Sequence, residues 1–352
     1  MPELFDITDW HQQPWFSTGG TRAKKYLQNP ENHKYYYFKK SYKTQGRNYF
    51  FEFWSEIIAT EIGNRLGFTV LKYDLAVDGN EMGCISESMI QNENEALIEG
   101  GRYLQAHDMR FDPNVKEGRK LYSFDLIEEA LAFFDLDHIN NIIEIIVFDS
   151  IIGNGDRHQE NWAFINEHTA FSKSLDGIDK VAKKNVEIPK WIKWLFSGTY
   201  DFEKRQKKQN GNIIDLQLQK KKSFAPIFDN GSSLGRELEE EKVLRMLNDK
   251  QELDAYINRG VSEIHWDNDK ITHFNFLKNL LQTSYREVVL EVIKRVINSY
   301  NSSNLEKIIL SIDDKVPENL NKYKLPESRK SLILKLVSLR IERLRELSYA
   351  GI

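Results

Sequence analysis

The chain has 352 residues, 40% of them hydrophobic and 29% charged, so it can bury a large core beneath an ordinary polar surface. Lysine and arginine total 49 against 53 aspartate and glutamate, and the net charge of −4 argues against bulk electrostatic binding of nucleic acid. The single cysteine, Cys84, excludes an internal disulfide and any multi-cysteine metal site.

Residues 1–95 are predicted to form one mixed unit of strands and a helix. The aromatic and β-branched runs "KYYYFKKSY" and "FTVLKYDLAV" are typical of strands. Between them, "NYFFEFWSEIIATEIGNRLGF" predicts a helix with Ile58, Ile62 and Leu66 on one face and Gly67 as its C-cap. The run "GCISESMI" is then expected to be the last strand of this unit.

Residues 96–352 are predicted to be mostly helical. The run "INNIIEIIVFDSI" is apolar on several faces and indicates a buried helix, while "WAFI" and "SFAPIF" indicate short strands. Two apolar stripes at three-and-four spacing, within residues 285–297 and 334–344, predict helices packed in a core. Residues 167–222 are basic within an acidic chain and are interpreted as an insertion between two strands.

The stretch "GNGDRHQENWAFI", residues 153–165, concentrates ionisable and amide side chains after a sharp glycine turn. Phosphoryl transfer needs a carboxylate to orient the attacking hydroxyl, and oxygen ligands that hold Mg²⁺. Asp156 is the candidate carboxylate. Asn161, five residues later, and Asp229, at the end of "SFAPIFD", are candidate metal ligands because amide and carboxylate oxygens suit a hard divalent cation.

The pattern N-G-D-R-H-x-x-N followed by P-x-x-D resembles the catalytic loop and metal-binding aspartate of HipA-type serine/threonine kinases. Phosphoinositide kinases have a similar loop. The resemblance implies an α+β, two-lobed protein-kinase-like fold with a largely helical C-terminal lobe, using ATP and Mg²⁺. It makes Asp156 the catalytic base and Asn161 and Asp229 the Mg²⁺ ligands. It also implies that Arg157 and His158 brace the loop, with His158 an alternative proton acceptor.

The stretch "FSTGGTRAK" resembles the phosphate loop of the same kinases, whose serine is autophosphorylated in some members. Adjacent glycines let backbone N–H groups approach a phosphate, although most such pairs are simply turns. Autophosphorylation is expected at Ser17, with Thr18 as the alternative. The residues expected to bind ATP here are Ser17, Thr18, Gly19, Gly20, Thr21 and Lys24.

Three further ATP-binding roles follow from the resemblance. Lys39 is chosen as the phosphate-binding lysine, and Glu56 on the following helix is its expected partner. The backbone of "SESM", including Glu87 and Met89, is the expected adenine-binding hinge. The rivals left open are Lys40 for the lysine, and Glu52 and Glu61 for the glutamate.

The resemblance favours a protein substrate with a serine or threonine acceptor, a toxin or effector role, and an antitoxin partner. The alternatives are a lipid kinase, a kinase fold that binds without catalysis, and a metal-dependent nuclease using Asp156, Glu160 and Asp229. The sequence contains neither the motif of a zinc deaminase nor that of a zinc protease. The best-known HipA kinases carry an extra N-terminal subdomain, and the 73-residue spacing from Asp156 to Asp229 is unusually long.

The acidic N-terminus lacks a secretory signal, and no apolar run is long enough to span a bilayer, so a cytoplasmic protein is expected, or a translocated one if it is an effector. The insertion places tryptophans among lysines in "IPKWIKWLF", which allows peripheral membrane contact. Packing of these tryptophans on the second lobe is the favoured interpretation. We expect the insertion to set substrate choice rather than chemistry.

Overall fold

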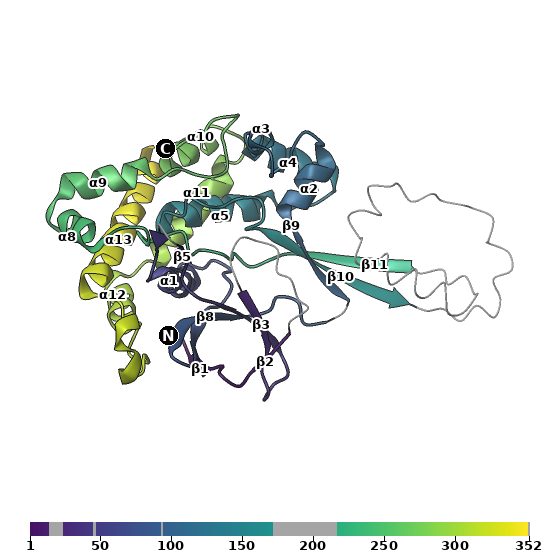
Figure 1. The fold of residues 1–352 in the computed structure, drawn as a ribbon. Coiled ribbons are helices and arrows are strands. Elements are labelled where there is room, and N and C mark those ends of the chain that lie inside the picture. The colour runs from purple at the N-terminus through teal and green to yellow at the C-terminus, as the bar shows by residue number, and fades with distance from the viewer. Residues whose placement is uncertain (14–23, 45–46, 93, 172–216, 351–352) are drawn as a thin grey trace, which may run out of the picture.

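The computed structural model describes residues 1–13, 24–44, 47–92, 94–171 and 217–350. They form a smaller lobe built on a sheet and a larger helical lobe, with a narrow antiparallel sheet extending to one side (Figure 1). The α+β, two-lobed architecture predicted from the sequence is confirmed.

The smaller lobe is built on a six-stranded sheet in the order β1-β7-β8-β4-β3-β2. β1 pairs with β7 in parallel, and the other neighbours are antiparallel. The strands are β1 (Leu4–Asp6), β2 (His11–Gln12), β3 (Lys24–Gln28), β4 (Tyr35–Lys39), β7 (Asp74–Asp78) and β8 (Glu81–Glu87); β5 (Lys43–Thr44) and β6 (Arg47–Asn48) form a separate hairpin.

The alternation of β4 assigns its side chains to two faces. Tyr36 and Phe38 point into a small core on the outer face of the sheet. Lys39 therefore lies on the opposite face, toward the helical lobe. The register pairs Lys39 with Lys24 of β3 and with Cys84 of β8, so these three residues share that inner face.

Helix α1 (Glu52–Arg65) lies between the sheet and the helical lobe and is buried from Glu52 through Gly63. A helix enclosed on all sides needs no polar stripe facing solvent, which is why isoleucines occur on more than one face of α1. Leu66 is the C-cap, and Gly67 follows it with φ of +81°, so the predicted cap is displaced by one residue.

The second lobe begins with a three-stranded antiparallel sheet in the order β11-β10-β9. Its strands are β9 (Glu95–Glu99), β10 (Ala163–Phe171) and β11 (Gln217–Phe224). The helices are α2 (Gly100–His107), α3 (Lys116–Arg119), α4 (Phe124–Phe133), α5 (Ile139–Ile152), α8 (Glu240–Asn248), α9 (Lys250–Arg259), α10 (His273–Leu280), α11 (Arg286–Ser299), α12 (Ser302–Leu310), η1 (Glu318–Tyr323) and α13 (Glu327–Ala350).

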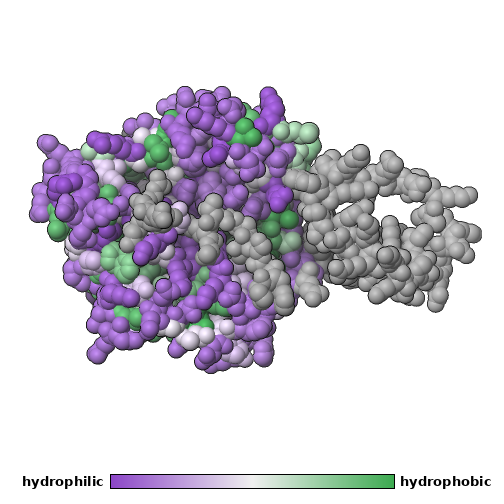
Figure 2. All heavy atoms as spheres, in the orientation of Figure 1, coloured by the Kyte–Doolittle hydropathy of each residue, from purple (hydrophilic) through white to green (hydrophobic). Residues whose placement is uncertain are grey.

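One hydrophobic core joins the two lobes. It runs from α1 through the buried helix α5 to α11 and α13, so the lobes share packing rather than meeting only at a hinge. The face seen in Figure 2 is largely hydrophilic, with hydrophobic residues in small scattered groups. Within the described residues no helix combines the length and apolar character needed to cross a membrane.

Some predicted elements differ from the structure. The strand expected over "SFAPIF" ends at Phe224, because Pro226 has no N–H for a ladder, and only Ile227 bridges onward, to Val70. The strand expected over residues 68–77 begins only at Asp74. The short strands β1, β2, β3, β5, β6 and β9 were not predicted from the sequence.

Both ends of the segment interpreted as an insertion, residues 167–222, belong to strands. Residues 167–171 continue β10, and residues 217–222 belong to β11, which pairs with it antiparallel. Residues 172–216, which include the tryptophans of "IPKWIKWLF", lie outside the described residues.

Candidate active site

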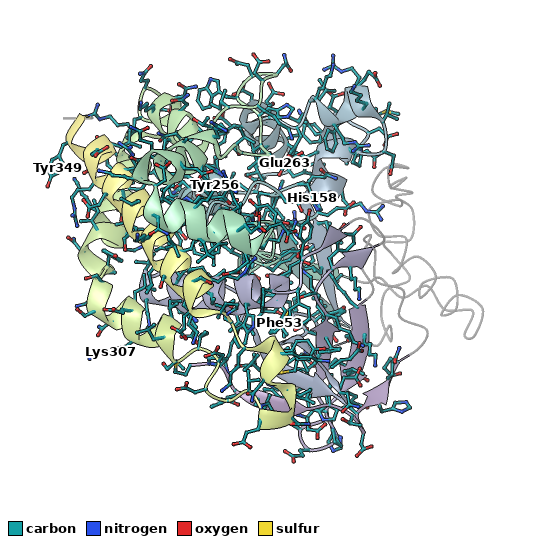
Figure 3. The ribbon with its side chains drawn as sticks, turned by 60° about the vertical axis from the view of Figure 1, so that its left-hand side comes forward. Phe53, His158, Tyr256, Glu263, Lys307 and Tyr349 are labelled. Atoms are coloured by element: carbon teal, nitrogen blue, oxygen red, sulfur yellow. The ribbon has the colours of Figure 1, made fainter. Side chains whose placement is uncertain are left out.

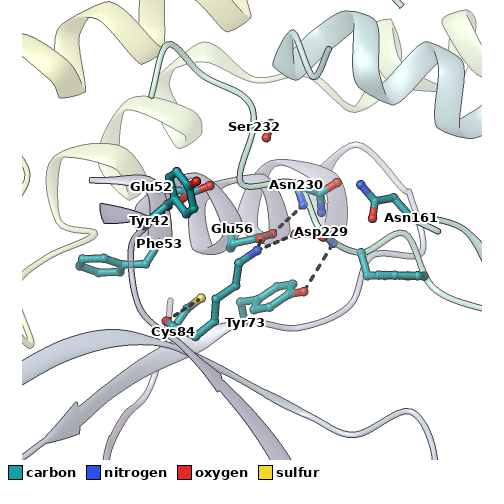
Figure 4. Close-up of polar contacts among 12 residues, drawn as sticks. Tyr42, Glu52, Phe53, Glu56, Tyr73, Cys84, Asn161, Asp229, Asn230 and Ser232 are labelled. Atoms are coloured by element: carbon teal, nitrogen blue, oxygen red, sulfur yellow. Dashed lines mark hydrogen bonds and ion pairs between the residues drawn. The ribbon is translucent and has the colours of Figure 1, made fainter. Parts of the chain in front are cut away.

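Lys39 lies at the centre of a buried ionic cluster between the lobes, in which its partners are Glu56 and Asp229 (both labelled in Figure 4). Its Nζ lies 2.5 Å from Glu56 Oε1 and 2.5 Å from Asp229 Oδ1. The side chain of Lys39 is 6% exposed and that of Glu56 is fully buried. Burial raises the pKa of the Glu56 carboxyl, and the adjacent ammonium opposes this rise. The cluster thus joins β4, α1 and the segment that follows β11.

The neighbouring lysine takes a different position. Lys40 contacts Glu81 at the outer side of the sheet, with its Nζ also 3.9 Å from Asp78. Among the rival glutamates, Glu61 pairs with Arg65, and Glu52 pairs with Arg236. The residues expected to form the ion pair, Lys39 and Glu56, are in contact.

Glu56 also holds the segment that carries Asp229. Its Oε2 accepts a hydrogen bond from the backbone N–H of Asn230 at 2.6 Å, while the N–H of Asp229 points to the Tyr73 hydroxyl at 3.4 Å. Asp229 has φ of +56°, a left-handed conformation that an aspartate tolerates better than most residues. A Cβ on Gly231 would lie only 3.0 Å from Glu56 Oε1, so α1 approaches this turn closely.

The loop from Gly153 is organised by Arg157, which is 1% exposed. Its guanidinium donates twice to Asp149 of α5, at 3.0 and 2.8 Å, and to the carbonyl of Asn161 at 3.0 Å. It also donates to the carbonyl of Phe228 at 2.5 Å and to Asn230 Oδ1 at 2.7 Å. One side chain therefore ties the loop to the residues on either side of Asp229, and a buried guanidinium keeps its charge because Asp149 accompanies it.

Asp156 and Asn161 are linked within the loop. The Asn161 side-chain amide donates to the carbonyl of Asp156 at 2.8 Å, and the N–H of Asp156 donates to Asn154 Oδ1 at 3.1 Å. Asp156 Oδ2 accepts from the Ser232 hydroxyl at 3.0 Å. His158 is half-buried near the boundary between helices and strands (Figure 3), and its Nδ1 lies 3.4 Å from the N–H of Glu160.

The two candidate metal ligands, Asn161 and Asp229, fit Mg²⁺ better than a metal that needs several protein ligands. Because the amide nitrogen of Asn161 donates to the Asp156 carbonyl, the oxygen of that amide is directed away from the same carbonyl, which keeps Asn161 a candidate cation ligand together with Asp229. In the part of the chain that the structure describes, no three His, Cys, Asp or Glu side chains lie close enough to hold a metal. Mg²⁺ usually takes one or two protein carboxylates, its other ligands being water and phosphate oxygens.

The remaining expected ATP-binding residues fall into two groups. Lys24 stands opposite Lys39 on the inner face of the sheet, Glu87 ends β8 with its carboxylate 2.8 Å from Lys34 Nζ, and Met89 is half-buried just beyond. The others lie outside the described residues: Ser17, Thr18, Gly19, Gly20 and Thr21.

Several residues of this region were not predicted from the sequence. Asp149 was not singled out, although an acid in a buried helix signals a buried partner. Tyr26 and Tyr37 on the inner face of the sheet have ring centroids 4.8 Å apart, and burial raises the pKa of Tyr37 to about 12. Asn230 and Ser232 carried no local signal.

Comparison with solved structures shows what this fold is similar to. It matches the crystal structure of CtkA, a proinflammatory kinase of Helicobacter pylori, with a TM-score of 0.68 and 19% identity over 99% of this chain and 98% of that one. It also matches HipA of Shewanella oneidensis, solved with HipB and operator DNA, with a TM-score of 0.47 and 11% identity over 96% of this chain and 66% of that one. No protein-family model and no curated protein matches the chain. The likeness to CtkA establishes a kinase-like fold, in agreement with the resemblance found in the sequence.

Proposed function

We propose that the protein is an ATP-dependent kinase of the HipA-like serine/threonine type. The observation that carries the proposal is the contact of Lys39 with both Glu56 and Asp229. Arg157 holds the loop that contains Asp156 and Asn161 to the residues on either side of Asp229. A lysine held by a helix glutamate, beside a metal-binding carboxylate, is the arrangement by which kinases position ATP.

In this proposal each group has one task. Lys39 donates to the ATP phosphates and is held in place by Glu56. Asp156 accepts the proton of the acceptor hydroxyl as that oxygen attacks the γ-phosphorus and the bond to the bridging oxygen breaks. When bound, Mg²⁺ supplies neutralisation of the phosphate charge, and the residues that would hold it are Asn161 and Asp229.

The acceptor is proposed to be a serine or threonine of a protein, with Ser17 or Thr18 as sites of autophosphorylation. The toxin or effector role and the antitoxin partner come from the sequence resemblance alone. The cytoplasmic location is proposed from the signal and hydropathy features of the sequence given above. A lipid acceptor is the alternative to be tested beside the protein acceptor.

The first test is intact-mass spectrometry after incubation with Mg²⁺ and ATP. The wild type should gain at least one phosphate, whereas Asp156→Asn and Asp229→Asn should gain none, because one lacks the proton acceptor and the other a metal ligand. Circular dichroism should show that both variants remain folded. Parallel reactions with casein and with phosphatidylinositol vesicles identify the acceptor class.

An unchanged mass in a wild type that carried no phosphate at the start would contradict the proposal. The binding-module interpretation would then take its place.

A further inference from the structure

A chain of hydrogen bonds links α1 to Asp156 through the segment after Asp229. The Ser232 hydroxyl lies 3.0 Å from Asp156 Oδ2, and Arg236 Nη2 lies 2.9 Å from the same hydroxyl. Arg236 Nη1 lies 2.6 Å from Glu52 Oε1. Figure 4 shows Glu52 and Glu56 along α1, with Ser232 on the loop above them. The α1 helix thus contacts the active site twice, through carboxylates one turn apart.

The direction of these hydrogen bonds is determined by chemistry. A guanidinium has donors and no acceptor, so the Ser232 oxygen must accept from Arg236. Its single proton is then directed to Asp156. Among the described residues, the bond from Ser232 is the only side-chain hydrogen bond to the Asp156 carboxylate. The second oxygen of that carboxylate, Oδ1, is left for an acceptor hydroxyl.

The far end of the chain is firmly held. Glu52 is 1% exposed, and its second oxygen accepts from the backbone N–H of Tyr42 at 2.9 Å. The Arg236 guanidinium also lies over the ring of Tyr49, 4.3 Å from its centroid. A partly buried ion pair with a cation–π contact restricts Arg236 far more than an exposed pair would. Arg236 can therefore transmit the position of α1.

We propose that Ser232 and Arg236 are positioning residues for phosphoryl transfer, which fix the orientation of the Asp156 carboxylate and couple it to α1. The proposal rests on the proposed kinase function and assigns residues that the resemblance did not include. It makes alignment of the proton acceptor depend on the same helix that holds Lys39 through Glu56. Both residues are assigned to act through the Asp156 carboxylate rather than on ATP or the acceptor.

The test measures ADP release from Mg²⁺-ATP, with dephosphorylated casein as the acceptor probe. Ser232→Ala should lower kcat by about tenfold to hundredfold, the cost of a misaligned catalytic group, and leave the KM for ATP within about twofold. Ser232→Thr keeps the hydroxyl and should recover most of the rate. Arg236→Met should lower kcat, and the double variant should be no slower than Ser232→Ala alone, because both act through one hydroxyl.

Ser233→Ala is the matched control. The Ser233 hydroxyl donates to the carbonyl of Asn230 at 2.6 Å rather than to Asp156, so this variant should keep the wild-type kcat. Thermal melting of every variant separates a slow enzyme from an unfolded one.

Several results would overturn the inference while leaving the kinase function intact. These are a wild-type kcat in Ser232→Ala, a raised KM at constant kcat, an equal loss in Ser233→Ala, or additive effects in the double variant. Phosphate mapped to Ser232 would make it an acceptor and would equally refute the positioning role. A wild type that releases no ADP would overturn the proposed function itself, and the positioning role with it.

Discussion

At the scale of single residues, two adjacent lysines have opposite environments because a strand alternates. Lys39 reaches the buried carboxylates of Glu56 and Asp229, while Lys40 reaches Glu81 at the outer side. Lys40 is therefore a matched control for Lys39. If the role of Lys39 depends on its position and not only on its charge, substitution of Lys39 must lower activity more than substitution of Lys40 does.

We expect Lys39→Met to reduce phosphate transfer at least about 100-fold, because a charge-stabilising donor is lost where negative charge develops. Lys40→Met should retain activity within about twofold, since only an exposed ion pair is removed. Initial rates of ADP release measure both. Equal losses in the two variants would show that Lys39 has no special role.

Single residues also differ in whether the sequence alone could select them. Asp156 and Asn161 lie five residues apart in one loop, so a local motif was enough to select them. Glu52 and Glu56 lie one turn apart on the same helix, and helical spacing could not separate them. The register of α1 against β4 separates them: Glu56 contacts Lys39, and Glu52 contacts Arg236. The assigned roles stay predictions until the variants are measured.

At the scale of elements, the first residue of α10 introduces a sensitivity to acid. His273 is 3% exposed, and its Nε2 has no hydrogen-bond partner among the described residues. Burial, with the nearby charge of Arg340, lowers the pKa of His273 to about 3 from an ordinary value of 6.5. The unfolded chain therefore binds a proton below pH 6.5 that the folded chain does not bind, and the native state loses stability as the pH falls.

This predicts that His273→Leu removes part of the acid sensitivity. Between pH 6.5 and about pH 5, the wild type should lose about 2 kcal/mol of unfolding free energy that the variant does not lose. Urea denaturation at a series of pH values measures the difference. Substitution of the exposed His33 by Asn should leave the wild-type slope. If the unfolding free energies of the wild type and of His273→Leu changed with pH in parallel, folding would not hinder protonation of His273, and the prediction would be wrong.

Elements were predicted unevenly, for a physical reason. The helices α5, α11 and α13 have long apolar patterns, which the sequence displays over three or more turns. The strands β1, β2 and β3 are two to five residues long and partly exposed, so they lack a pattern long enough to detect. Their pairing depends on partners far along the chain, as when β1 joins β7.

In the molecule as a whole, the two residues that flank the basic segment 172–216 lie next to each other. Phe171 pairs with Gln217 in the β10–β11 ladder, so the Cα atoms of these two flanking residues lie about 5 Å apart. Figure 1 shows this ladder directed away from both lobes. The active-site contacts described above involve neither strand.

We therefore expect that replacing residues 172–216 by an Asn-Gly turn preserves the fold and the turnover of ATP, because two-residue turns of this kind close antiparallel ladders. The melting temperature should change by no more than a few degrees. If the segment sets substrate choice, relative activity on casein and binding to anionic vesicles should change. A variant that unfolds would refute the structural part, and one with unchanged acceptor preference would refute the functional part.

The paired ends of that ladder also bear on how such a protein can evolve. The entropy of closing a loop grows only slowly with its length, so segments of very different size can be accommodated there at similar stability. New recognition sequences could be acquired at this position, or lost from it, without compensating changes around Lys39 or Asp156. Targets could thus diverge between lineages while the chemistry is inherited unchanged.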